Sequence, residues 1–148
     1  MGTLEHESQV DFEAVGKKLQ SGATLSKDET FLVFGRATNF ASDLIDSNLK
    51  ETYATLPVSV EVRSHMTVVV LDRMVSLYQG GSTTLFDGLK KEVCEAFFIQ
   101  EENLSNERLY SVLSSSLDEY FTREISDEVV KKMSYIRGVA DQVVPSKT

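Results

Sequence analysis

Four short segments carry the signals that begin α-helices, and they constrain the fold of this chain more than any other feature. In Ser26–Glu29 and Thr84–Asp87, a hydroxyl residue is followed three positions later by an acid. That spacing lets the hydroxyl accept from a backbone N–H of the first turn while the acid accepts from the N–H of the capping residue. Ser105 and Ser126 precede acids that complement the positive end of a helix dipole. These signals predict a helical protein.

Apolar residues recur between these signals at spacings of three and four, which is the pattern of one buried helix face. Gly22, Pro57 and Pro145 are expected to end elements, and Gly80-Gly81 marks a loop. The stripes run over residues 10–19, 31–53, 85–97, 109–121 and 129–143. We therefore predict an all-α fold, a single compact bundle of five to seven amphipathic helices.

One stretch, residues 58–71, leaves a second fold class open. Val58–Arg63 alternates apolar and polar residues, and Thr67–Leu71 is rich in β-branched residues, both typical of strands. Apolar residues at helical spacing also run from Val62 to Leu77, and no turn pair separates the two possible strands. We predict one buried central helix over about 60–78; the alternative is an α+β fold with a short hairpin at 58–71.

Length and charge bound the organisation of the chain. Its 148 residues are 41% hydrophobic, enough for one folded domain. We predict a flexible N-terminal tail at 1–8, a single helical domain at 9–144 and a C-terminal tail at 145–148. The net charge of −8 is divided evenly about Met74 (7 basic and 11 acidic residues up to it, 8 and 12 after it). Such a surface repels phosphate backbones, so we expect no direct nucleic-acid binding.

The residues that usually carry chemistry are sparse. One cysteine cannot form an internal disulfide, and the two histidines do not reach a recognisable zinc spacing. Cys94 lies beside Glu92 and Glu95, whose charge disfavours a thiolate. We predict no enzyme activity, no cofactor and no metal site. With no apolar run near 18 residues, we predict no membrane span and an intracellular protein, cytoplasmic or nuclear.

These observations favour a non-catalytic helical interaction module. The expected role is protein–protein interaction, as a scaffold or adaptor, with a protein partner or a homo-oligomer. Three large apolar residues in a row, Phe97-Phe98-Ile99, cannot all face one side of a helix, so Phe98 and Ile99 are the candidate interaction surface.

The alternative function is a carrier or sensor of a small apolar ligand held between helices. Such a ligand would need a cavity lined by apolar side chains from facing helices. Large apolar residues along the stripes supply candidates for that lining: Phe31, Phe34, Phe40, Met66, Met74, Phe86 and Phe97.

Overall fold

Serine caps begin several helices of the computed structural model, which describes residues 11–49 and 58–145. Ser26 forms a reciprocal capping box, in which the Glu29 N–H donates to Ser26 Oγ at 3.1 Å and the Ser26 N–H donates to Glu29 Oε1 at 2.7 Å. Ser105 and Ser126 accept from the N–H groups of Arg108 and Val129. The sequence signals for these three helix starts are therefore confirmed.

Two other helix starts differ from the sequence-based prediction. Thr84 is not a cap: it is the first residue of its helix, and Thr83 before it makes no side-chain capping bond to the described residues. Ser59, which was not predicted as a cap, caps the central helix by accepting from the Val62 N–H at 3.1 Å. Ser59 lacks an acid three residues later, so the capping-box spacing does not reveal it.

Seven α-helices and one 3-10 turn occupy the described residues, which confirms the all-α fold class. The elements are α2 (Phe12–Ser21), α3 (Lys27–Leu49), α4 (Val60–Gln79), α5 (Thr84–Ala96), η1 (Glu101–Asn103), α6 (Asn106–Phe121), α7 (Asp127–Lys131) and α8 (Met133–Val143). Helix α3 runs through Gly35 and Asn39 without interruption. The last apolar stripe, expected to form one helix, is divided between α7 and α8 at Lys132.

The central helix α4 settles the question of residues 58–71. It runs from Val60 to Gln79 and contacts α3, α5, α6, α7 and α8, so the hairpin alternative is wrong. Val62, Met66 and Val70 are buried together with neighbours on other faces of the helix. Burial on most sides outweighs the modest cost of β-branched residues in a helix, because tertiary packing overrides intrinsic propensity.

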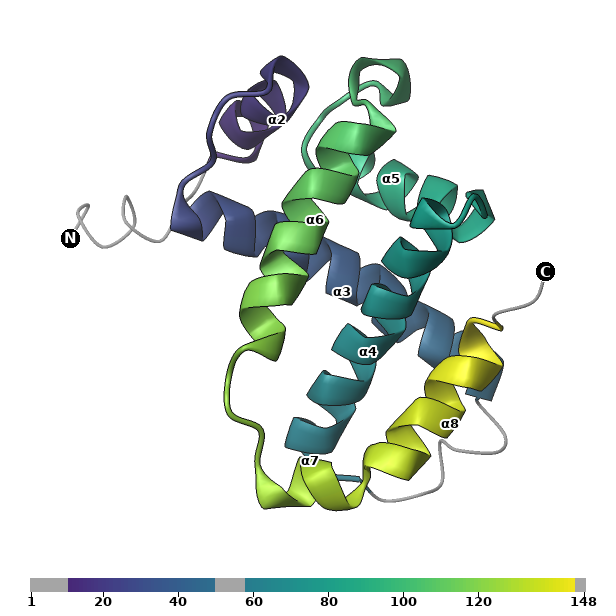
Figure 1. Cartoon of the computed structure of the whole chain (residues 1–148). Coiled ribbons are helices and arrows are strands. Elements are labelled where there is room, and N and C mark those ends of the chain that lie inside the picture. The colour runs from purple at the N-terminus through teal and green to yellow at the C-terminus, as the bar shows by residue number, and fades with distance from the viewer. Residues whose placement is uncertain (1–10, 50–57, 146–148) are drawn as a thin grey trace.

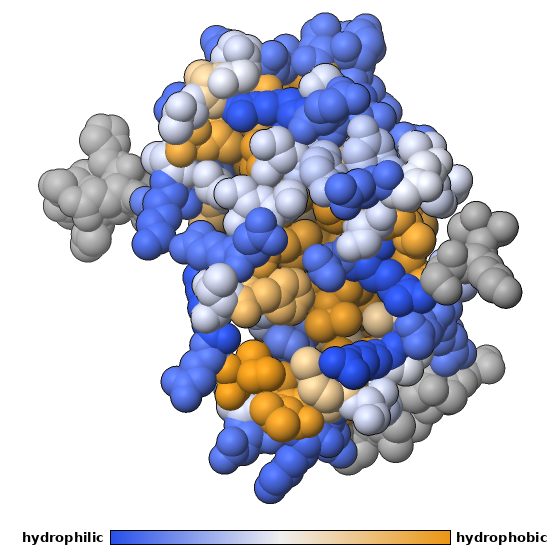
Figure 2. Space-filling view, viewed as in Figure 1, coloured by the Kyte–Doolittle hydropathy of each residue, from blue (hydrophilic) through white to orange (hydrophobic). Residues whose placement is uncertain are grey.

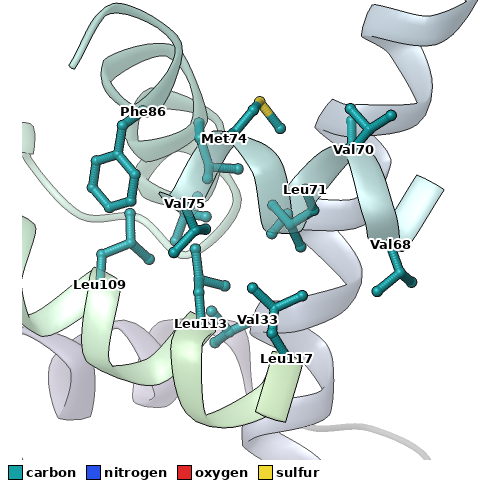
Figure 3. Packing of buried hydrophobic residues seen from close by; sticks show 14 of the residues in the cluster. Val33, Val68, Val70, Leu71, Met74, Val75, Phe86, Leu109, Leu113 and Leu117 are labelled. Carbon is teal, nitrogen blue, oxygen red and sulfur yellow. The ribbon is translucent and has the colours of Figure 1, made fainter. Parts of the chain in front are cut away.

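Five helices, α3 and α5 to α8, pack around α4. Figure 1 shows α6 and α8 on either side of α4, with α3 crossing behind them. Figure 3 shows the core between these helices, where Leu109, Leu113 and Leu117 of α6 face Leu71 and Val75 of α4. One cluster of buried apolar residues includes members of all seven α-helices. The predicted tail at 1–8, residues 146–148 and the predicted break at Pro57 lie outside the described residues.

Helix α2 packs against the C-terminal end of α5 and the N-terminal end of α6. Phe12 stacks on Phe97 with ring centroids 5.2 Å apart. The guanidinium of Arg108, in the first turn of α6, donates to the carbonyl oxygens of Lys18, Leu19 and Ala23. These carbonyls lie at the C-terminal end of α2, where a cation also complements the helix dipole.

Candidate interaction groove

The structure separates the two residues predicted as an interaction surface. Helix α5 ends at Ala96, so Phe97-Phe98-Ile99 forms a turn rather than a continuing helix. Phe97 is fully buried, Phe98 is 72% exposed, and Ile99 is only 7% exposed and belongs to the core. Only Phe98 is therefore available on the surface.

Phe98 has an unusual backbone conformation. Its φ of 59° lies in the left-handed region that favours glycine. The conformation closes the end of α5, because it lets the Ile99 N–H donate to the Cys94 carbonyl at 2.9 Å, the 6→1 bond of a Schellman motif. A bulky residue costs about 1–2 kcal/mol in this region. Phe98 thus combines backbone strain with an exposed ring, although it lines none of the hollows along α3.

A groove runs along one side of α3, where three hollows adjoin one another on the described surface. The central hollow, about 340 Å³, lies between the first half of α3 and the second half of α6. The second, about 330 Å³, lies between α3 and the start of α4, and it shares Phe31 and Phe34 with the central hollow. The third, about 230 Å³, shares Leu25, Thr30 and Ser115 with the central one. We call these three together the α3 groove.

One face of α3 forms the length of this groove. Its lining residues from Lys27 to Ser42 follow one another at alternating steps of three and one positions along the helix. From Leu25 to Ser42 the groove follows 17 steps along the chain, most of them within α3, or about 26 Å at the rise of an α-helix. The α3 groove is thus elongated, unlike a round cavity for one small ligand.

Phe31 is the apolar centre of the groove. It is 70% exposed, whereas Val33, Ala37 and Ala41 on the core side of α3 are fully buried. At about 100° per residue, Phe31 lies about 160° round the helix from Val33. Exposed large apolar side chains in a concave surface are typical of sites that bind another molecule.

Basic side chains dominate the charged lining of the groove. Among the described residues that line it, four are cations, Lys27, Arg63, Arg108 and Arg123, and one is an acid, Glu119. The whole chain has the opposite balance, with 15 basic and 23 acidic residues. The groove is therefore a basic strip on an acidic protein.

A buried histidine joins α4 to α6 beside the central hollow. His65 Nδ1 lies 3.0 Å from the Tyr120 hydroxyl, and Tyr120 in turn lines the hollow. His65 is buried, and burial lowers the pKa of its imidazole. Its Nε2 is buried without a hydrogen-bond partner among the described residues. The neutral ring thus acts as a packing and hydrogen-bonding link between two helices that border the groove.

The other candidate chemical groups do not form a reactive constellation. Cys94 is buried in α5, and burial raises the pKa of its thiol. Within the described residues, no three His, Cys, Asp or Glu side chains gather in the manner of a metal site. In the same part of the chain, no helix has both the length and the apolar character needed to cross a bilayer.

The α3 groove is not apparent from the sequence. The pattern places Phe31 and Phe34 in the apolar stripe of α3 or in a ligand cavity, whereas both line an open groove. Of the other proposed cavity residues, Phe40 is partly buried against the core. Four more lie within the core: Met66, Met74, Phe86 and Phe97. One signal in the sequence could have indicated the exposed side of α3. A run of apolar residues four apart marks a buried face of the helix, and Phe31 lies on another face. These residues are Val33, Ala37, Ala41 and Ile45.

Comparisons with protein-family models, with curated proteins and with solved structures give no match for this chain. The functional proposal therefore depends on the groove itself.

Proposed function

We propose that this protein is a non-catalytic interaction module that binds a helix of a partner protein in the α3 groove. The observation that carries the proposal is the exposed Phe31 at the centre of an elongated concave surface. Amphipathic helices commonly bind in grooves between bundle helices, with anchors repeated every three or four residues. A groove about 26 Å long accommodates about five turns of such a helix.

The available apolar surface supports a specific contact. A Phe side chain buries about 150–250 Å² in an interface, and Phe31 is 70% exposed in the free protein. Covering the exposed part removes roughly 100–150 Å² from water, worth about 3 kcal/mol. Interfaces usually depend on a few such residues, so Phe31 has the expected properties of an anchor.

A small apolar ligand is the competing occupant, and it has one observation in its favour. Leu25, Phe31 and Phe34 give the central hollow an apolar side, and its volume is in the range of a small-molecule site. Native mass spectrometry of the freshly purified protein tests this alternative. A retained small molecule that is lost in Phe31→Asp would favour the carrier.

Two matched variants test the proposed function. Phe31→Asp places a charge in the α3 groove, and Val60→Asp places the same charge at an 82% exposed valine outside it. Both side chains are exposed, so both variants should fold. Proteins that co-purify with the wild type from its native cells are compared between the variants. Each candidate partner is then purified and its affinity measured directly.

The proposal requires one particular pattern of results. A partner should bind the wild type and Val60→Asp with similar affinity, and Phe31→Asp should weaken its binding by on the order of a hundredfold. Equal binding of all three proteins to every purified partner would show that the interaction surface lies elsewhere.

A further inference from the structure

We infer that the helix bound in the α3 groove is amphipathic with acidic residues flanking its apolar anchors. This inference rests on the proposed function and specifies the chemistry of the partner. It follows from the charges that line the groove and from how few of them are neutralised within the protein.

Three of the four basic residues in the groove keep their charge available. Arg63 is paired with Asp46 at 2.9 Å. Lys27, Arg108 and Arg123 have no carboxylate within ion-pair distance in the described part of the chain. Arg108 donates to backbone carbonyls at the C-terminal end of α2, which orient its guanidinium and offset only part of its charge. An acidic partner would supply the missing counter-charges.

These cations are distributed along the groove rather than gathered at one point. Arg108 lines the hollow at one end, and Arg63 lines the hollow at the other end. Lys27, at the start of α3, and Arg123, just after the end of α6, line the central hollow. Phe31 lies between them at the junction of two hollows. A helix with acidic residues on both sides of an apolar stripe matches this arrangement, because its anchors cover Phe31 while its flanks face the cations.

The central hollow also provides a defined position for a carboxylate. The Arg123 guanidinium lies 5.9 Å from the centroid of the Tyr120 ring, so the ring limits where this long side chain goes. Glu119 lines the same hollow and is the one acid among the described residues of its lining. Because it is a single acid against two cations, the hollow keeps a net positive lining, and Glu119 disfavours partners that carry an acid directly opposite it.

A selection experiment tests the inference before any partner is identified. The probe is a phage-displayed library of 18-residue helical peptides with apolar anchors at helical spacing and fully randomised flanking positions. The library is selected against the wild type, against Phe31→Asp, and against the double variant Lys27→Glu/Arg123→Glu. A second double variant, Lys131→Glu/Arg137→Glu, makes the same charge change at exposed sites outside the groove.

We expect the wild type and the Lys131→Glu/Arg137→Glu control to enrich peptides with Asp and Glu at the flanks. The best peptide, made synthetically, should bind Lys27→Glu/Arg123→Glu about tenfold more weakly than the control. Its affinity for the wild type should also fall as salt is raised, because exposed charges are screened. Phe31→Asp should enrich none of these peptides.

Failure of the acidic partner and failure of the helix-binding groove give different results. If peptides are enriched on the wild type but not on Phe31→Asp, and their flanking residues are neutral or basic, the inference of an acidic partner is overturned. The groove would still be a helix-binding site. No enrichment above Phe31→Asp overturns both. A wild-type dimer in sedimentation that Phe31→Asp abolishes would identify a second copy of the chain as the occupant and would also overturn the inference.

Discussion

The Gly→Ala substitution should have opposite effects on stability at Gly16 and Gly138. Gly16 lies where α2 contacts the end of α5, whereas Gly138 has open space beside it. A Cβ added at Gly16 would lie 2.1 Å from the carbonyl oxygen of Phe97 and 3.2 Å from Cγ1 of Ile99. A Cβ added at Gly138, in α8, meets nothing within 4 Å. Both glycines are in helices, so Gly→Ala should stabilise the helix backbone by the same amount at each. The two sites differ only in the space available for the added methyl group.

The expected magnitudes follow from these two environments. Alanine in place of glycine within a helix stabilises by about 0.5–1 kcal/mol, which is the whole effect at Gly138. At Gly16 the methyl group overlaps a backbone oxygen that cannot rotate away, so α2 must shift by about 1 Å or more. Overpacking of this kind costs about 1–3 kcal/mol. Since about 1 kcal/mol corresponds to 2–4 °C at this size, Gly16→Ala should melt several degrees below and Gly138→Ala a few degrees above the wild type.

Thermal melts and urea unfolding of the three proteins measure these changes. Amide hydrogen exchange on α2 separates global destabilisation from local detachment, because a detached α2 would lose protection while the rest of the bundle kept it. If Gly16→Ala melts at or above the wild-type temperature with α2 still protected, the close packing of α2 against Phe97 is wrong.

Phe98, His65 and Cys94 give three further predictions. Phe98→Gly should stabilise by about 1 kcal/mol in urea unfolding because it relieves the positive φ, whereas Phe98→Ala should not, and equal stability of both would exclude backbone strain. Burial lowers the pKa of His65, so the unfolded chain binds a proton first as pH falls below about 6.5. The free energy of unfolding should therefore decrease over that range, and His65→Gln should flatten the decrease. Cys94→Ser should lower stability by about 1–3 kcal/mol in a melt and leave partner affinity unchanged, since the thiol is buried and its pKa is raised.

The sequence predicts the helices well because their signals are local. Ser26 and Glu29 form their capping box within four residues, and the apolar stripe of α6 is visible without its neighbours. The stretch 58–71 is harder, since its β-branched residues favour a strand and only packing on most sides of α4 decides for a helix. The break between α7 and α8 at Lys132 is also not predicted, because the apolar periodicity continues through it.

Surface features are less predictable from the sequence for a different reason. Phe98 and Ile99 would both be candidates for exposure only if α5 continued, whereas the chain turns after Ala96 and sends Ile99 into the core. The α3 groove depends on where α6 and the start of α4 pack against α3, which no single stripe encodes. Figure 2 shows how mixed the surface is on one face, where apolar areas between α6 and α8 and beside α7 lie among hydrophilic side chains.

Arg108 links the packing of α2 to the α3 groove. Its guanidinium satisfies carbonyls at the C-terminal end of α2 and also lines the hollow at one end of the groove. A change that displaces α2, such as Gly16→Ala, should therefore release this side chain and alter the charge at that end. Helix α2 therefore acts on the groove through Arg108, although it contributes Val15 and Leu19 to the buried cluster and lines none of the three hollows itself. Binding measurements on the α3 groove consequently depend on α2 remaining in place, and they report on its position as well as on Phe31.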